Sequence, residues 1–103
     1  MIRPNMYTIE QSLEFKKWFD GLRDELIKLR LTARLIRAEN GNFGDYKIVD
    51  GQLLELRMTF GGGIRIYFTI RNGKVILLLR GGDKSTQQRD ITKAKRLLAE
   101  LED

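Results

Sequence analysis

One stretch of the chain decides the fold, and it runs from Glu55 to Lys84 with the sequence ELRMTFGGGIRIYFTIRNGKVILLLRGGDK. Asn72-Gly73 lies between two runs rich in β-branched and aliphatic residues, and this dipeptide favours a tight turn with positive φ at both positions. Three glycines, residues 61–63, separate an earlier apolar run from the next and can reverse the chain with little steric restriction. The stretch therefore predicts three consecutive antiparallel strands.

These strands divide their side chains between two faces, because successive residues of a strand point to opposite sides. One face is predicted to be apolar and to carry Leu54, Leu56, Met58, Phe60, Ile64, Ile66, Phe68, Ile70, Val75, Leu77 and Leu79. The other face is predicted to carry Glu55, Arg57, Thr59, Arg65, Tyr67, Thr69, Ile76, Leu78 and Arg80. We call this second surface the basic face, since three arginines converge on it.

Turn lengths predict which residues of the basic face lie opposite one another. A two-residue turn after the second strand puts Arg65 opposite Arg80, and a three-residue glycine loop puts Arg57 opposite Tyr67 and Thr59 opposite Arg65. Like charges directly opposite each other destabilise a sheet. The arginines are therefore either an ordinary solvent-exposed face or a site for an anion or an acidic partner, and the residues leave both interpretations open.

Apolar residues at helical spacing predict two helices before this stretch. Ser12 is a candidate N-cap for a helix that ends near Gly21, after a candidate short edge strand over residues 6–9. Asp24 opens a longer helix that Gly41 ends. The predicted core stripe of the longer helix is Leu22, Leu26, Leu29, Ala33 and Ile36, with Arg23, Arg30, Arg34 and Arg37 on another face. The short link between the helices favours an antiparallel hairpin.

The remaining segments complete the predicted fold. Residues 46–49 and the turn Asp50-Gly51 predict another strand, which pairs with residues 52–60. The pattern Ser85-x-x-Gln88 matches a capping box for a C-terminal helix, whose buried residues are predicted to be Ile91, Ala94, Leu98 and Leu101. The order of elements indicates an α+β fold, with an N-terminal helical hairpin and a C-terminal helix on one face of a small antiparallel β-sheet.

Composition limits the chemistry that the chain can perform. Its 103 residues are expected to form a single domain, residues 1–103, without room for a separate cofactor domain. The sequence has no cysteine and no histidine, which removes thiolate chemistry and both the commonest general base and the commonest transition-metal ligand. Zinc enzymes and Ser-His-Asp hydrolases are therefore not expected.

Charge and hydropathy bear on partners and location. The formal charge of +5 favours a polyanionic or acidic partner. No apolar run approaches the ~20 residues that a membrane span requires, and residues 1–5 lack the apolar core of a signal peptide. The default expectation is a cytoplasmic protein without a membrane partner.

Several segments together resemble the addiction-module killer proteins on the HigB-like branch of the RelE/ParE toxin superfamily, which includes phage-derived Gp49-like proteins. These segments are Glu55-Leu56-Arg57, Gly63-Ile64-Arg65-Ile66-Tyr67-Phe68 and Leu78-Leu79-Arg80-Gly81-Gly82-Asp83-Lys84, with residues 41–47 and 88–91 in support. The resemblance covers the chain from about Tyr7 to its C-terminus. It implies a RelE-like fold and the toxin of a type II toxin–antitoxin system, namely a ribosome-dependent mRNA interferase that uses no cofactor.

Such an enzyme cleaves translated mRNA by metal-independent attack of the 2′-hydroxyl, which requires a base, an acid and cations for the phosphorane charge. Arginine binds phosphate through two donors and stays charged, and a lysine crowded by arginines can act as a base. The candidate catalytic residues are Arg57, Arg65, Lys84, Lys47 and Glu55, and the candidate substrate-binding residues are Arg80 and Tyr67. By resemblance, Arg65 is the central phosphate-stabilising arginine. Glu55 stands where some relatives have a lysine base, so either Glu55 or Lys47 could serve.

Two other functions share this fold, so the fold does not decide between them. One is a ParE-like gyrase poison, which binds a protein and cuts no RNA. The other is a non-catalytic RNA-binding relative, which would need stacking aromatic residues on the sheet. The resemblance also implies a cognate helix-turn-helix antitoxin, the ribosome and mRNA as partners, and contact with operator DNA only through the antitoxin.

Overall fold

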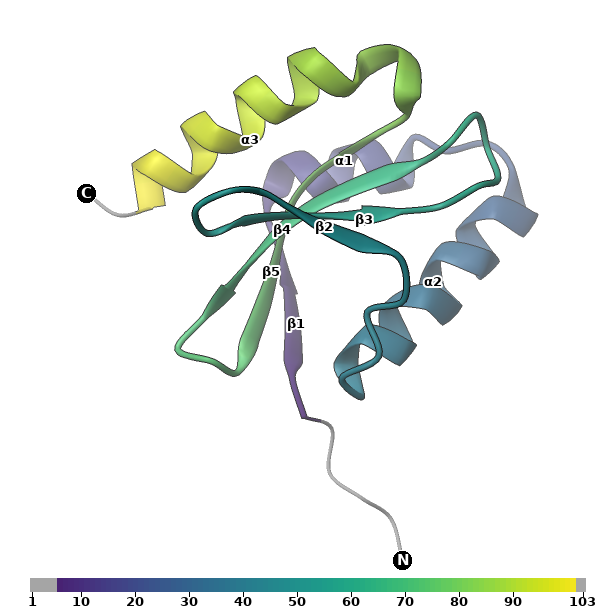
Figure 1. Cartoon of the computed structure of the whole chain (residues 1–103). Coiled ribbons are helices and arrows are strands. Elements are labelled where there is room, and N and C mark those ends of the chain that lie inside the picture. Colours follow the sequence, from purple (N-terminus) through teal and green to yellow (C-terminus); the bar gives the residue numbers. More distant parts are fainter. Residues whose placement is uncertain (1–5, 102–103) are drawn as a thin grey trace, which may run out of the picture.

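Within residues 6–101, which the computed structural model describes, a five-stranded sheet lies between helices (Figure 1). The elements are β1 (Thr8–Gln11), α1 (Leu13–Asp20), α2 (Glu25–Glu39), β2 (Tyr46–Asp50), β3 (Leu53–Arg57), β4 (Arg65–Arg71), β5 (Val75–Gly82), the 3₁₀ turn η1 (Lys84–Thr86) and α3 (Gln87–Leu101). The strand order is β1-β5-β4-β3-β2, and every neighbouring pair is antiparallel except β1 with β5. The predicted α+β fold is confirmed.

Local signals at several boundaries are also confirmed. The Ser12 hydroxyl accepts a hydrogen bond from the Phe15 backbone N–H and so caps α1, which ends at Gly21. The edge strand β1 is present but begins two residues later than residue 6. None of the helices described in residues 6–101 is both long and apolar enough to cross a membrane.

The helices cover both faces of the sheet, which corrects the expectation of helices on one face only. Helices α1 and α2 cover a core of Phe15, Leu31, Ala38, Leu56, Met58, Ile64, Ile66, Phe68, Ile76 and Leu78. Helix α3 covers a second core of Leu53, Tyr67, Leu77, Leu79 and Ala94. The cause is the unbroken apolar run of β5, residues 75–79, which supplies apolar side chains to both faces and favours cover on both.

The register of β5 differs from the predicted one by a shift and a bulge. Asn72 and Gly73 have φ of 54° and 66°, as predicted, but Arg71 pairs with Val75 because the loop is one residue longer. A β-bulge then separates the pairs of β4 residues 67 and 68. As a result, Ile76 and Leu78 join the core under α1 and α2, and Arg65 lies opposite Gly82 rather than Arg80.

The glycine loop is also longer than predicted, so β3 pairs differently with β4. Arg57 lies opposite Arg65 and Glu55 opposite Tyr67. Two rows of side chains therefore cross the face under α3. One row is Lys47, Glu55, Tyr67 and Arg80, and the other is Arg57, Arg65 and Gly82.

Helix α2 packs on a different side from the one predicted. Leu26, Leu29 and Ile36 are 56%, 66% and 53% exposed, whereas Leu31 and Ala38 are buried. The sequence of α2 contains two apolar stripes, and the one that includes residues 27, 31, 35 and 38 faces the sheet. Arg34 lies on the buried side, where its guanidinium donates to the carbonyl oxygens of Phe43, Asp45 and Arg57. Burial there satisfies loop carbonyls that would otherwise lack partners.

The 3₁₀ turn η1, which leads directly into α3, is capped by Asp83 rather than by the predicted Ser85-x-x-Gln88 box. Asp83 accepts a hydrogen bond from the Ser85 backbone N–H and forms a capping box with Thr86. The hydrogen bond from the Ser85 hydroxyl is the main reason that the pKa of Asp83 is lowered. Of the residues predicted to be buried, Ala94 is buried and Ile91 and Leu98 half-buried, but Leu101 is 41% exposed.

Candidate anion-binding site

A hollow of about 500 Å³ opens beside the glycine loop, where β3 ends and β4 begins. It is lined by Asp45, Arg57, Met58, Thr59, Gly62, Gly63, Arg65 and Lys84, and we call it the basic hollow. Three of the candidate catalytic residues meet here: Arg57 from β3, Arg65 from β4 and Lys84 from the turn that follows β5.

The register of the sheet explains why these three residues meet. Arg57 and Arg65 are direct cross-strand partners, and Gly82 is the partner of Arg65 on β5. The chain therefore leaves β5 beside Arg65, and Lys84 follows two residues later. Gly63, at φ +81°, permits a close approach, because a Cβ added there would lie 3.0 Å from the Lys84 Cγ. The glycine loop thus places the lysine stem against the edge of the hollow.

Arg65 is on the predicted face, but its side chain is buried rather than open, with 6% exposure. Its Nη1 donates to the carbonyl oxygens of Met58, Gly63 and Ile64 at 3.2, 3.1 and 3.2 Å. Its Nε is buried without a hydrogen-bond partner among residues 6–101, and none of the ion pairs found there includes Arg65. A buried cation without a counter-charge carries a desolvation cost that a bound anion would offset.

Arg57 and Lys84 are more accessible than Arg65. The Arg57 side chain is 40% exposed, and its Nε lies 3.9 Å from Oδ2 of the exposed Asp45. At this distance and exposure the pair contributes little to stability, so Arg57 can exchange Asp45 for another anion. Lys84 is exposed. The lining of the hollow therefore holds three positive side chains against one carboxylate.

The row of Lys47, Glu55, Tyr67 and Arg80 lies beside the hollow. Helix α3 covers part of this row and so buries two of the candidate residues. Glu55 is 1% exposed and accepts a hydrogen bond of 2.9 Å from Gln87 Nε2. Tyr67 is 0% exposed, and its hydroxyl has no hydrogen-bond partner among residues 6–101. Burial, reinforced by the nearby Glu55 charge, raises the pKa of Tyr67. Lys47, opposite Glu55 on the edge strand, is exposed but does not line the hollow.

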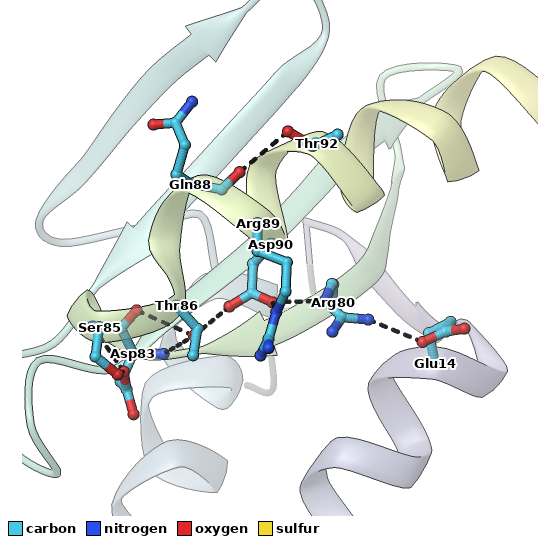
Figure 2. A network of polar contacts seen from close by, with 9 residues as sticks. All are labelled: Glu14, Arg80, Asp83, Ser85, Thr86, Gln88, Arg89, Asp90 and Thr92. Atoms are coloured by element: carbon cyan, nitrogen blue, oxygen red, sulfur yellow. Dashed lines mark hydrogen bonds and ion pairs between the residues drawn. The ribbon is translucent and has the colours of Figure 1, made fainter.

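Arg80 belongs to a separate polar network that fastens two helices to β5 (Figure 2). Its Nε lies 2.7 Å from Oδ1 of the buried Asp90 on α3, and its Nη1 lies 3.0 Å from Oε2 of Glu14 on α1. The Thr86 hydroxyl donates to the other Asp90 oxygen. Two carboxylates therefore balance the Arg80 charge, and a substrate-binding role for Arg80 or for the buried Tyr67 stays a prediction.

The Gly81-Gly82 pair serves close packing on the two faces of β5. A Cβ on Gly81 would overlap the Trp18 ring, and a Cβ on Gly82 would overlap the Asp90 carboxylate. Glycine at both positions lets α1 and α3 approach the strand from opposite sides. This packing fixes where the chain leaves β5 and hence where Lys84 lies.

Sequence reasoning missed residues that support the site without lining it. Gln87 and Asp90 hold α3 over the sheet, and Arg34 holds the carbonyl oxygens of Asp45 and Arg57 next to the hollow. The sequence feature that could have indicated such residues is an arginine or a carboxylate on the apolar side of an amphipathic helix. Such a residue is buried only when it has partners, and those partners lie far away in the sequence.

Comparisons with known proteins bear on the family to which this chain belongs. A protein of Haemophilus influenzae (strain KW20 / Rd), described only as an uncharacterized protein, is 44% identical over 93 residues, which are 90% of this chain and 94% of its own length. The family model described as Phage derived protein Gp49-like (DUF891) matches residues 14–99, which include every lining residue of the basic hollow. The chain therefore belongs to the phage-derived Gp49-like family, which is a toxin-like family.

Proposed function

We propose that this protein is the toxin of a type II toxin–antitoxin system and that it acts as a ribosome-dependent mRNA interferase. The observation that carries the proposal is the convergence of Arg57, Arg65 and Lys84 in one hollow with a single carboxylate. Clustered guanidinium and ammonium groups suit a phosphodiester, whereas a protein that only binds gyrase has no need of them.

The chemistry is attack of a ribose 2′-hydroxyl on the adjacent phosphorus. A 2′,3′-cyclic phosphate forms, the bond from phosphorus to the 5′-oxygen breaks, and that oxygen takes a proton. The negative charge of the phosphorane is greatest in the transition state, so fixed cations stabilise it more than they stabilise the substrate. Arg65, held by three backbone carbonyls, is the preorganised cation, and the more exposed Arg57 binds a second phosphate oxygen.

Proton transfer is assigned by position. The Lys84 ammonium is the donor group at the rim of the hollow, so we assign it to protonation of the 5′-oxygen. Glu55 and Lys47 remain the candidates for the base that accepts the 2′-hydroxyl proton. Glu55 is bonded to Gln87 beneath α3, so it would need α3 to shift, whereas Lys47 is already exposed.

A toxin-like family implies an antitoxin partner in general. We propose that this partner is a helix-turn-helix protein, that it connects the toxin to operator DNA, and that the ribosome and mRNA are the targets once the toxin is free. The net charge of +5 supports an acidic surface on whatever covers the basic hollow.

A translation reaction with a defined mRNA tests the proposal. New 5′ ends are mapped by primer extension with and without the purified protein, on translated message and on the same message without ribosomes. The proposal predicts cuts only on translated message. Blocked translation of an intact message would indicate another ribosomal target. Unaffected translation would contradict the proposal, and a gyrase supercoiling assay would then test the ParE-like alternative.

A further inference from the structure

Helix α2 presents an apolar stripe to solvent on the side that faces away from the sheet. The stripe consists of Leu26, Leu29, Ala33 and Ile36, and we call it the outer stripe. Its three large side chains are 56%, 66% and 53% exposed, and Ala33 is exposed as well. Single exposed leucines are common, but four apolar residues aligned on one helix form a continuous patch.

The spacing of the outer stripe is that of a helix-packing seam. Its residues are three, four and three positions apart, which is the a–d repeat of a coiled coil. The stripe extends from Leu26 to Ile36 within the 15 residues of α2, a length of about 15 Å at 1.5 Å per residue. Such a surface fits a second helix that lies along it.

The apolar surface continues beyond the helix at one end. Ile36 also lines a groove of about 280 Å³, together with Leu35 of α2, Ile9 of the edge strand β1 and Phe15 of α1. A bound helix could therefore bury an apolar side chain in this groove at the end of the seam. The groove thus gives one end of the stripe a defined shape, which can fix the position of a bound helix along α2.

The charges that flank the outer stripe are asymmetric. Arg30 and Arg37 lie seven residues apart along one edge, each directly after a seam residue, and the Arg30 guanidinium is held 5.5 Å from the centre of the Phe60 ring. The other edge carries Glu25, Thr32 and Glu39, and Glu39 lines the groove beside Ile36, so this edge is acidic where the first is basic. In coiled coils the flanking positions choose the partner through their charges, so the arginine edge selects acidic side chains.

A second copy of this chain fits the stripe poorly. In an antiparallel pairing, Arg30 of one copy would face Arg37 of the other, and like charges oppose such contact. In a parallel pairing, Glu25 could face Arg30, but Arg37 would face Thr32. Each copy also carries a net charge of +5, which adds repulsion.

We propose that the outer stripe of α2 binds an amphipathic helix of another protein, one whose own apolar seam is flanked by acidic residues. The apolar seam supplies the buried area, the groove beside Ile36 fixes the register, and Arg30 and Arg37 select the charge. This inference does not depend on any catalytic activity of the basic hollow, because α2 contributes no residue to the lining of that hollow.

Two designed peptides of about three heptads test the proposal. Both carry leucine at the seam positions, but at the flanking positions that would face Arg30 and Arg37 one has glutamate and its twin has lysine. Binding of each labelled peptide to the whole protein is measured by fluorescence anisotropy at physiological salt. We expect saturable binding of the acidic peptide and at least tenfold weaker binding of the basic one.

Variants locate the site. Leu29→Gln combined with Ile36→Gln should weaken binding of the acidic peptide at least tenfold, and thermal unfolding verifies that this variant folds. Ile48→Gln is the matched control, because Ile48 is 63% exposed on the edge strand β2 and belongs neither to the outer stripe nor to the lining of the groove beside Ile36, and this variant should bind like the unmodified chain. Arg30→Glu combined with Arg37→Glu should shift the preference toward the basic peptide.

Three results would overturn the proposal. Equal binding of both peptides would remove the charge argument. Undiminished binding of the acidic peptide by the folded double glutamine variant would place the peptide elsewhere, such as in the basic hollow. A concentration-dependent dimer in sedimentation that the double glutamine variant abolishes would assign the stripe to a second copy of the chain.

Discussion

Replacement of Arg65 should weaken the fold as well as the anion site, because one guanidinium performs both tasks. Its Nη1 is within 3.1–3.2 Å of three carbonyl oxygens of the glycine loop and the adjoining strands. The side chain is buried, so water does not replace these hydrogen bonds freely when the donor is removed. Arg65→Ala therefore removes the guanidinium donor from these carbonyl oxygens and leaves a gap beneath the loop, although the Ile64 oxygen still accepts from the Met58 backbone N–H.

The size of the effect follows from the number of donors. Nη1 has two hydrogens, and each hydrogen bond from a charged donor contributes about 1.5–3 kcal/mol. Removal of a buried charge that has no ion-pair partner returns part of this energy. The net loss in the free energy of unfolding should be about 2–4 kcal/mol. For a domain of this size that lowers Tm by roughly 10–20 °C.

The assay is urea unfolding followed by the fluorescence of Trp18, the only tryptophan, whose ring packs on Gly81. Arg71→Ala is the matched control, because Arg71 is an exposed arginine at the far end of β4 and should change stability by less than about 0.5 kcal/mol. If Arg65→Ala were as stable as the control, the loop carbonyls would not depend on the guanidinium, and the structural role assigned to Arg65 would be wrong.

Three further predictions concern single side chains. Tyr67→Phe should leave stability at pH 7 nearly unchanged, because the Tyr67 hydroxyl has no hydrogen-bond partner among residues 6–101. Because folding raises the pKa of Tyr67 above its ordinary value of 10.0, Tyr67 ionises above pH 10 in the unfolded chain before it ionises in the folded one. The unmodified protein should therefore lose stability above pH 10 and Tyr67→Phe should lose less, which unfolding curves at several alkaline pH values would show. Gly63→Ala should cost about 1 kcal/mol or more, because φ is +81° and the new Cβ crowds Lys84, and thermal unfolding measures it. Leu31→Ala should cost about 2–5 kcal/mol whereas Leu29→Ala should cost less than about 1 kcal/mol, and equal losses in urea unfolding would contradict the orientation of α2.

Much of the sheet could be predicted because its turns carry local signals. Asn72-Gly73 and the three glycines fixed where the chain reverses, and positive φ is found at all five of these residues. Register could not be predicted, because the apolar run of residues 75–79 has no alternation that would distinguish one face from the other. The one-residue shift and the bulge are then decided by packing on both faces of the sheet.

The orientation of α2 could not be predicted, because two of its sides are apolar. The more regular stripe faces solvent, and the packed side includes Arg34, a residue that hydropathy places outside. Its burial depends on carbonyl oxygens of residues 43, 45 and 57, which are brought to the helix only by the completed fold.

Only part of the candidate site could be predicted, because local patterns show which face of a strand a residue is on but not which helix covers that face. Alternation placed Arg57 and Arg65 on one face, and the segment after β5 placed Lys84 at its rim, and these three line the basic hollow. Alternation could not show that α3 covers the neighbouring row. That cover depends on contacts of Gln87 with Glu55 and of Asp90 with Arg80, which join positions that no sequence periodicity relates.

The most direct test of cleavage in the basic hollow is the rate at which Arg57→Ala cuts translated mRNA, compared with the rate for Arg71→Ala. Both variants remove one partly or fully exposed arginine from the sheet, but only Arg57 lines the basic hollow, and neither should unfold the domain. Loss of a group that stabilises transition-state charge costs on the order of 10²–10³ in rate. We predict a loss of this size for Arg57→Ala and a rate close to that of unmodified protein for Arg71→Ala. Equal rates for the two variants would contradict the assignment of the basic hollow as the site of cleavage.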